Sequence, residues 1–327
     1  MIMGDFMEKI FNKLIEIIKN NEKFLIMTHK NPDFDGIGSA IALQQIINSF
    51  NKDCLICVNN NNKNNSLLKA YDEINKQGLF YKTINKSNII IEEYDVLIIL
   101  DTHKKEMLEL PNVIDKASNI IILDHHIKSK NYINKSILSY INSNISSTVE
   151  IIVEFSKYLN KKINPLIATF MLVGLEIDTN NFKLKTTPKT YETAAYLAKM
   201  GADNILKQEL LQENKEIYLK RQKLIEQSYM INENMILCVA DMEIYENKDL
   251  AAMALDLLQF ESVEASFVIA KIKEDTIGIS ARSIGEIDVE KIMTKLGGGG
   301  HKEEAATQIK DKTLDEVKQI LIKTIGE

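Results

Sequence analysis

Short, unbroken apolar runs recur in the first half of the chain, and segments of helical periodicity separate them. These runs lie at 24–28, 54–58, 96–100 and 120–123. A strand buried on both faces carries apolar side chains at successive positions, and parallel strands need long crossovers, usually helices. The runs therefore predict an α/β domain in which helices cover both faces of a parallel sheet.

The pattern changes after residue 231. We expect strands at 235–240, 265–271 and 276–281, and helices at 250–259, 289–296 and 314–325. The segment just before this change is highly charged and helical in pattern. With 327 residues and 45% apolar content, the chain can fill two cores. The sequence thus predicts an α/β domain at 1–201, a helical linker at 202–231 and a smaller α/β domain at 232–327.

Composition and charge exclude several classes of protein. No apolar run approaches the roughly 20 residues that a membrane helix needs. The first residues also lack the basic and apolar regions of a signal peptide. A net charge of −6 disfavours the binding of long nucleic acid through its phosphates. We therefore expect a cytoplasmic protein with neither a membrane nor a long nucleic acid as partner.

Three cysteines, Cys54, Cys57 and Cys238, are too few for a disulfide framework and odd in number. Cys54 and Cys57 form a C-x-x-C pair, but a structural zinc site of this type needs a second pair. We interpret the two residues as part of a buried strand.

Acidic and imidazole side chains follow three of the expected strands. The carboxyl ends of parallel strands meet at one edge of the sheet, where ligands of such folds bind. One helical segment adds a further carboxylate after residue 177. The residues concerned are His29, Asp33, Asp35, Asp101, His103, Asp124, His125, His126 and Asp178.

Mixed imidazole and carboxylate ligands suit a divalent transition metal such as manganese. The carboxylates are numerous enough for two ions, and two ions about 3.5–4 Å apart can clamp a phosphoryl group. A simpler interpretation stays open for single residues, since Asp33 and Asp35 could cap the helix expected from Gly38 onward.

A second set of residues lies mainly in the second domain. Four glycines precede His301 and would let the backbone approach a phosphate closely, although a flexible hinge is the alternative. Arg282 could bind a phosphate bidentately or form a surface ion pair. Ser147 and Thr148 open an expected helix, where they could cap it or help to bind phosphate.

Taken in order, these motifs resemble the DHH phosphoesterases. The runs 29–35, 101–103 (DTH) and 124–126 (DHH) are similar to motifs I to III of that family. Asp178 with Thr179 is similar to motif IV, and 297–301 to the signature of the DHH-associated C-terminal domain. The resemblance covers nearly the whole chain and implies the two-domain α/β architecture described above.

Two stretches narrow the resemblance. The segments 178–186 and 279–308 are similar to the catalytic part of bacterial cyclic di-AMP phosphodiesterases. Members anchored in membranes carry further domains upstream, so we expect a free-standing catalytic unit here. Two departures from the family pattern are Glu176, close to Asp178, and Ile145, which precedes Ser146.

The resemblance also implies roles for individual residues. His29 and Asp33 would hold one manganese ion, Asp35, His125 and Asp178 a second, and Asp101 would bridge the two. His126 and His103 would contact the phosphate or tune the ligands, and together with Asp101 they form the expected catalytic set. The expected substrate contacts are Ser280, Arg282, Gly298, Gly299, Gly300, His301, Ser147 and Thr148.

The expected function is that of a manganese-dependent phosphodiesterase. It would open cyclic di-AMP to linear 5′-pApA by attack of a metal-activated hydroxide. The alternative is a nanoRNase or pAp phosphatase that acts on linear pApA and short oligonucleotides to give mononucleotides. A third hypothesis is a regulator that binds the nucleotide without cleaving it. The resemblance also allows a homodimer.

Overall fold

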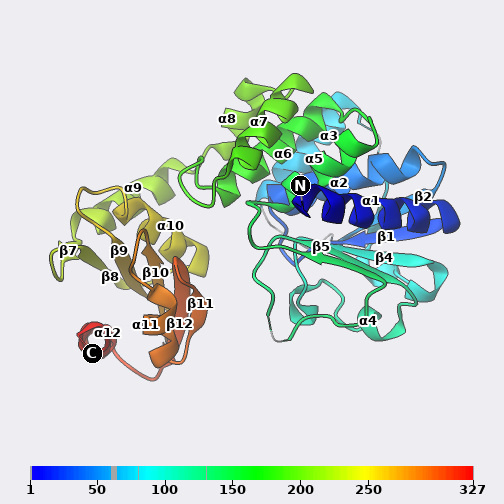
Figure 1. The fold of residues 1–327 in the computed structure, drawn as a ribbon. Helices are drawn as coiled ribbons and strands as arrows, with labels where there is room; N and C mark the ends of the chain where they lie inside the picture. Colours follow the sequence, from blue (N-terminus) through cyan, green and yellow to red (C-terminus); the bar gives the residue numbers. More distant parts are fainter. Residues whose placement is uncertain (1, 60–64, 80, 130, 327) are drawn as a thin grey trace. The chain divides into compact units, whose positions relative to one another are not determined.

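The computed structural model describes residues 2–59, 65–79, 81–129 and 131–326 (Figure 1). The chain divides into two units, Met1–Gln212 and Glu213–Glu327. None of the helices in the described ranges combines the length and apolar character of a bilayer-spanning segment.

The first unit is built on a six-stranded sheet in the order β3-β2-β1-β4-β5-β6. Each neighbouring pair of strands is parallel, which confirms the predicted sheet. The strand order reverses between β1 and β4, so this is a doubly wound sheet with its switch point at these two strands. The strands are β1 (Lys23–Met27), β2 (Asp53–Val58), β3 (Thr83–Asn85), β4 (Val96–Leu100), β5 (Ile120–Asp124) and β6 (Leu138–Ile141).

Both faces of this sheet are covered, which explains the unbroken apolar runs. Ile98 and Leu100 belong to a large hydrophobic cluster on one face, whereas Leu97 and Ile99 belong to a smaller cluster on the other. Figure 1 shows α1, α2, α5 and α6 on the first face and α4 on the second. The helices are α1 (Ile2–Asn20), α2 (Phe34–Asn48), α3 (Asn65–Gln77), α4 (Val113–Lys116), α5 (Thr148–Tyr158), α6 (Pro165–Asp178), α7 (Pro188–Lys199) and α8 (Asn204–Leu211).

The second unit has a mixed six-stranded sheet in the order β11-β12-β10-β9-β8-β7. Strands β8 and β9 pair in parallel and the other neighbours pair antiparallel. The strands are β7 (Tyr229–Met230), β8 (Met235–Ile244), β9 (Ala265–Lys273), β10 (Thr276–Ser283), β11 (Gly299–His301) and β12 (Glu304–Lys310). The helices are α9 (Lys215–Glu226), α10 (Asn247–Leu257), α11 (Val289–Lys295) and α12 (Leu314–Ile325). The second α/β domain expected from the sequence is thereby confirmed.

The segment expected as a helical linker contains two helices that pack on different units. Leu206 and Leu210 of α8 belong to the hydrophobic cluster of the first unit. Leu224 and Ile225 of α9 belong to a cluster of the second. The division between the units therefore falls inside the segment 202–231.

All three cysteines are free and buried. Cys54 and Cys57 lie in β2 an odd number of positions apart, so their side chains join hydrophobic clusters on opposite faces of the sheet. Burial raises the pKa of the Cys57 thiol to about 12. This geometry agrees with the interpretation of the C-x-x-C pair as part of a buried strand.

Candidate metal centre

The predicted ligands of the first unit come together at the carboxyl edge of its sheet. Asp101 follows β4 directly, Asp124 is the last residue of β5, and Asp178 is the last residue of α6. The cluster therefore lies beside the switch point between β1 and β4, where ligands of doubly wound sheets bind. The cluster contains three groups of residues, and within each group the ligand atoms all lie within 4.8 Å of one another. The groups are His29, Asp33 and Asp101; Asp35, His125 and Asp178; and Asp101, His125 and His126.

Asp101 faces both halves of this cluster. Its Oδ2 lies 3.3 Å from Nε2 of His29, and its Oδ1 lies 3.3 Å from Nε2 of His125. Its backbone has a φ of 61°, a left-handed conformation that Asp adopts more readily than most residues. Each carboxylate oxygen therefore points to a different group of ligands, which is the geometry expected of a bridging residue.

The amino end of α5 holds two of the carboxylates in place. Asp35 accepts hydrogen bonds from the backbone N–H of Thr148 at 2.9 Å and of Val149 at 2.7 Å. The Thr148 hydroxyl donates to Asp101 at 3.2 Å. The helix dipole adds to these bonds, because a helix start favours negative charge. Thr148 is thus committed to the carboxylates, while the hydroxyl of Ser147 is buried without a hydrogen-bond partner among the described residues.

Two glycines allow α6 to approach α2 closely enough to place Asp178 beside Asp35. A Cβ at Gly174 of α6 would lie 2.5 Å from the backbone nitrogen of Asp35. A Cβ at Gly38 of α2 would lie 3.0 Å from the backbone nitrogen of Met171. Gly174 and Asp178 are one helical turn apart and share a face of α6. The close approach at Gly174 therefore brings Asp178 into the cluster.

Three carboxylates of the cluster and one imidazole have strongly perturbed pKa values. Burial first, and then the neighbouring carboxylates, raise the pKa of Asp35 and of Asp178. Burial opposes ionisation of Asp101 as well, but hydrogen bonds from His125 and His29 hold the pKa of Asp101 well below its usual range. Burial likewise opposes protonation of His29, yet Asp101 and Asp33 raise the pKa of His29 to about 9. The cluster thus concentrates negative charge that a bound cation would offset.

The donor set fits a divalent cation. The Oδ2 atom of Asp178 is buried and has no hydrogen-bond partner among the described residues. A buried polar atom without a partner is costly, so such an atom indicates a missing ligand. The remaining donors are imidazole nitrogens and carboxylate oxygens, which suit transition metals such as manganese.

Adding Mn²⁺ to metal-free protein should raise its thermal unfolding midpoint. At a free concentration 100 times the dissociation constant, binding to the native state adds about 2.7 kcal/mol. For a unit of this size that corresponds to a rise of about 5–10 °C. Differential scanning calorimetry after EDTA treatment and dialysis measures this shift. An unchanged midpoint at saturating Mn²⁺ would contradict the assignment of this cluster as a metal centre.

His103 lies outside the ligand cluster and contacts Asp124, whose carboxylate also contacts His126. Its Nε2 accepts a hydrogen bond from the backbone N–H of Ser129 at 2.9 Å. Nδ1 must then carry the proton that it donates to Asp124. Asp124 Oδ1 lies 2.7 Å from Nδ1 of His126, whose own distance to Asp101 Oδ1 is 3.8 Å. Asp124 was expected among the acidic residues at the strand ends but was given no role there, and its carboxylate contacts both His103 and His126.

His126 has the exposure that a substrate-contacting group needs. Its side chain is 50% exposed, whereas that of His103 is 1% exposed. The backbone N–H of His126 also donates to Asp124 at 3.1 Å. The half-exposed ring of His126 is therefore held on its buried side by Asp124, which is itself paired with the buried His103.

Glu176, which departs from the family pattern, is paired away from the cluster. Its carboxylate accepts a hydrogen bond from Nζ of Lys207 on α8, and both side chains are largely buried. This pair offsets the charge of Glu176. The other departure, Ile145, is part of the hydrophobic cluster.

In the second unit, strand pairing brings the predicted substrate residues together. Arg282 of β10 pairs with Glu304 of β12, which pairs with His301 of β11. Paired residues on neighbouring strands have side chains on the same face. Ser280 lies two positions before Arg282 and shares that face. The guanidinium of Arg282 donates to the carbonyl of Ala281 at 2.9 Å, and its Nε is buried without a hydrogen-bond partner among the described residues.

Two of the glycines that precede His301 are required by packing within the second unit. A Cβ at Gly298 would lie 2.2 Å from the carbonyl oxygen of Ala306. Gly300 has a φ of 152°, and a Cβ there would lie 2.4 Å from Cα of Ala305. Gly299 faces open space. Close approach of β12 thus accounts for Gly298 and Gly300, whereas Gly297 and Gly299 have open space where a side chain would stand.

Comparisons with known families support both units. A model of the DHH family, N-terminal domain, matches residues 23–175. A model of the DHHA1 domain matches residues 234–327. The two matches fall within the two units of the structure.

Among curated proteins, two similar relatives are cyclic-di-AMP phosphodiesterases. GdpP of Geobacillus thermodenitrificans is 36% identical over 324 residues, or 97% of this chain and 49% of the relative. PdeA of Listeria monocytogenes is 34% identical over 322 residues, or 97% of this chain and 49% of the relative. The chain thus spans about half the length of each.

Among solved structures, an exopolyphosphatase-related protein from Bacteroides fragilis is similar in fold. The TM-score is 0.79 at 18% identity, and the match covers 98% of this chain and 96% of the other. At that identity the likeness supports the fold alone.

Proposed function

This chain belongs to the DHH family, and we propose that it is a manganese-dependent phosphodiesterase that opens cyclic di-AMP to linear 5′-pApA. The observation that carries the proposal is the two-part cluster of ligands joined by the carboxylate of Asp101. The names of the two curated relatives support cyclic di-AMP as the substrate.

The ligand sets suggest two ions. We assign His29 and Asp33 to one ion, Asp35, His125 and Asp178 to the other, and Asp101 to both. When bound, two such ions lower the pKa of a coordinated water and offset charge on the phosphoryl oxygens. The protein in turn fixes the spacing of the two sets, because the amino end of α5 holds both Asp35 and Asp101.

His126 is the group that we place against the phosphodiester. It lies beside Asp101 and is half exposed, and Asp124 fixes its ring through Nδ1. A hydrogen bond from His126 to a phosphoryl oxygen would orient the diester and stabilise developing charge. His103 then serves as a positioning residue behind Asp124, and Thr148 as a support for the carboxylates.

The second unit would bind the nucleotide. Ser280, Arg282 and His301 share one face of its sheet, and Gly299 has an open face. A guanidinium can bind phosphate oxygens bidentately. The buried and unpaired Nε of Arg282 supports such a role.

A time course with Mn²⁺ tests the proposal. Cyclic di-AMP and linear 5′-pApA are offered separately, and the products are resolved by chromatography. We expect faster loss of the cyclic substrate, with the linear dinucleotide accumulating. Faster conversion of the linear dinucleotide to AMP, with the cyclic one barely consumed, would instead favour a nanoRNase. Binding of cyclic di-AMP without turnover would favour a regulator.

Replacing His103 should slow catalysis through His126. His103→Leu removes the bond to Asp124 and should lower kcat by about 10- to 100-fold, as outer-shell substitutions at metal sites do. His103→Asn keeps an N–H near the position of Nδ1 and should recover part of the loss. Steady-state kinetics measure both, with near-ultraviolet circular dichroism to verify folding. Wild-type kcat in a folded His103→Leu protein would show that this chain of bonds has no catalytic role.

A further inference from the structure

The amino end of α5 lacks the cap that its sequence pattern usually forms. Ser147 is the N-cap residue and Glu150 follows three positions later, which is the spacing of a capping box. The side chain of Ser147, however, forms no cap hydrogen bond. The backbone N–H groups of Thr148 and Val149 donate instead to Asp35 of α2. A carboxylate of the metal centre thus caps this helix, and the helix in turn orients that carboxylate.

Glu150 uses its carboxylate to join two other segments. Its side chain is buried, and its Oε1 accepts a hydrogen bond from the hydroxyl of Ser146 in the loop before α5. The same Oε1 accepts from the hydroxyl of Thr190 at 2.7 Å, in the first turn of α7. Thr190 also accepts from the backbone N–H of Thr187 at 3.0 Å as part of the cap of α7. Because hydrogen bonds to carboxylates are stronger than neutral ones, Glu150 anchors the loop before α5 to the start of α7.

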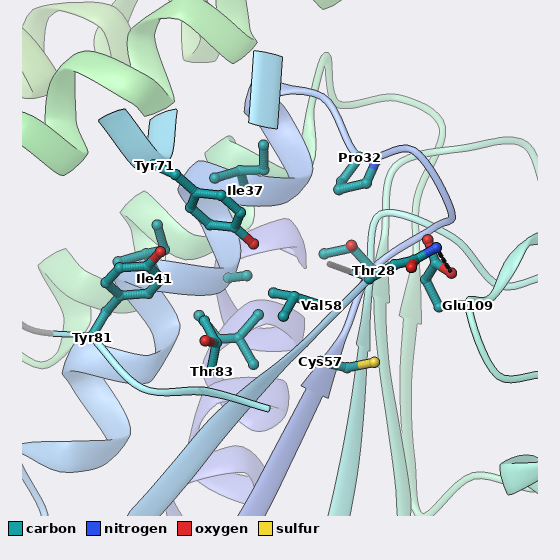
Figure 2. Close-up of a pocket in the computed structure, with 13 residues that line it drawn as sticks. Thr28, Pro32, Ile37, Ile41, Cys57, Val58, Tyr71, Tyr81, Thr83 and Glu109 are labelled. Carbon is teal, nitrogen blue, oxygen red and sulfur yellow. Dashed lines mark hydrogen bonds between the residues drawn. The ribbon is translucent and has the colours of Figure 1, made fainter. Parts of the chain in front are cut away.

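The ligand that α5 orients stands on a helix with its own firm packing. Asp35 lies in the first turn of α2. Further along α2, Ile37 and Ile41 belong to the large hydrophobic cluster, against which Tyr71 and Tyr81 also pack. Figure 2 shows these four side chains around a small cavity beside α2. Since α2 is held in this way, the position of the α5 start decides whether its N–H groups reach the carboxylate of Asp35.

We propose that Glu150 is a positioning residue of the metal centre. Through Ser146 and Thr190 it holds the amino end of α5 where the first two N–H groups of the helix meet Asp35. The inference rests on the ligand assignments of the proposed function. It gives a role to a buried acidic side chain that belongs to none of the three ligand groups.

A shift of the α5 start would act on two ligands at once. Asp35 receives one N–H group on each carboxylate oxygen, which leaves lone pairs on both oxygens for a cation. Asp101 receives the Thr148 hydroxyl on Oδ1, the oxygen that faces His125. Without the anchor, both carboxylates would lose a donor that fixes their rotation. The ion that we assign to Asp35, His125 and Asp178 should then bind more weakly.

The affinity for Mn²⁺ tests this role separately from folding. Thr190→Val keeps the shape of the side chain and removes the hydroxyl that Glu150 accepts from. Calorimetric titration of metal-free protein should show one Mn²⁺ ion binding about tenfold more weakly, the lower end of the range for groups that orient metal ligands. Glu150→Gln weakens both bonds and should act in the same direction, with a lower kcat for cyclic di-AMP. Thr190→Ser keeps the hydroxyl and should restore most of the affinity. Urea unfolding of metal-free protein measures any loss of the α7 cap on its own.

Thr193→Val is the matched control. Thr193 lies on the same helix and is buried, but its hydroxyl has no hydrogen-bond partner among the described residues. We expect wild-type Mn²⁺ affinity in this variant. Wild-type affinity in folded Glu150→Gln protein, or an equal loss in Thr193→Val, would overturn the role of Glu150 and leave the proposed function standing. Wild-type protein that binds no Mn²⁺ would instead overturn the proposed metal centre, and the role of Glu150 with it.

Discussion

Asp101→Asn should lower kcat for cyclic di-AMP by about 1,000-fold or more, at least the loss seen when one preorganised electrostatic group is removed. The substitution removes one negative charge from the point where the two ligand groups meet. An amide oxygen is a weaker metal ligand than a carboxylate, and an amide cannot bridge two cations through two anionic oxygens. Both ions should therefore bind more weakly, and their spacing should no longer be fixed.

Asn is preferable to Ala at this position because of the backbone. With a φ of 61°, residue 101 occupies a region that Asn tolerates and most other residues do not. Asp101→Asn therefore separates the loss of the ligand from backbone strain. Asp115→Asn is the control, since Asp115 forms an exposed ion pair with Lys105 whose loss costs little. Turnover of Asp101→Asn within a few-fold of wild type would remove Asp101 from the metal centre.

Gly174→Ala should destabilise the first unit and weaken Mn²⁺ binding together. The new methyl group would meet backbone atoms at 2.5–2.7 Å, and backbone cannot move aside as a flexible side chain can. Helix α6 must then shift away from α2. Overpacking of this kind typically lowers the free energy of unfolding by about 1–3 kcal/mol. Because Asp178 shares the affected face of α6, its carboxylate should also move away from Asp35. Urea unfolding of metal-free protein and Mn²⁺ titration measure the two effects.

Gly326→Ala controls for the general effect of adding a methyl group to a glycine, here the residue that directly follows α12 and has helical backbone angles. Its nearest atoms would lie 3.7 Å from the added Cβ, an ordinary contact. We expect its unfolding free energy to stay within about 0.5 kcal/mol of wild type, as for other unstrained surface substitutions. Loss of stability in Gly174→Ala without any change in Mn²⁺ affinity would refute the coupling between this contact and the ligand geometry.

The ligand cluster was predictable because its signal is local in sequence. Each ligand follows an apolar strand or ends a helix, and the ends of parallel strands meet at one edge. The family motif alone places Asp101 between His29 and His125, and in the structure its two carboxylate oxygens each lie 3.3 Å from one of these imidazoles.

The supporting contacts were not predictable in the same way. The bond from Ser129 to His103, and the pair of Glu176 with Lys207, join segments whose approach depends on the packed fold. Asp124 stands in a run of expected ligands, and its hydrogen bonds to His103 and His126 could not be read from that run. The segment expected as a linker is divided between the two units, because the apolar residues of α8 pack on the first unit and those of α9 pack on the second.

The glycines show the same limit. A glycine-rich run suggests an approach to phosphate, but the run itself does not show which glycine faces a neighbouring strand. Gly298 and Gly300 pack on β12, and Gly299 does not. Gly174 carried no signal in the sequence, although its contact with Asp35 sets the position of a ligand.

Counting bound Mn²⁺ ions while following hydrolysis tests whether the cluster around Asp101 holds two ions that the reaction needs. Metal-free protein is titrated with Mn²⁺, bound ions are counted by equilibrium dialysis and elemental analysis, and cyclic di-AMP turnover is measured at each point. We expect two ions per chain, with turnover rising as the second ion binds and lost on addition of EDTA. Full turnover by the metal-free protein, or with a single bound ion, would contradict a centre bridged by Asp101.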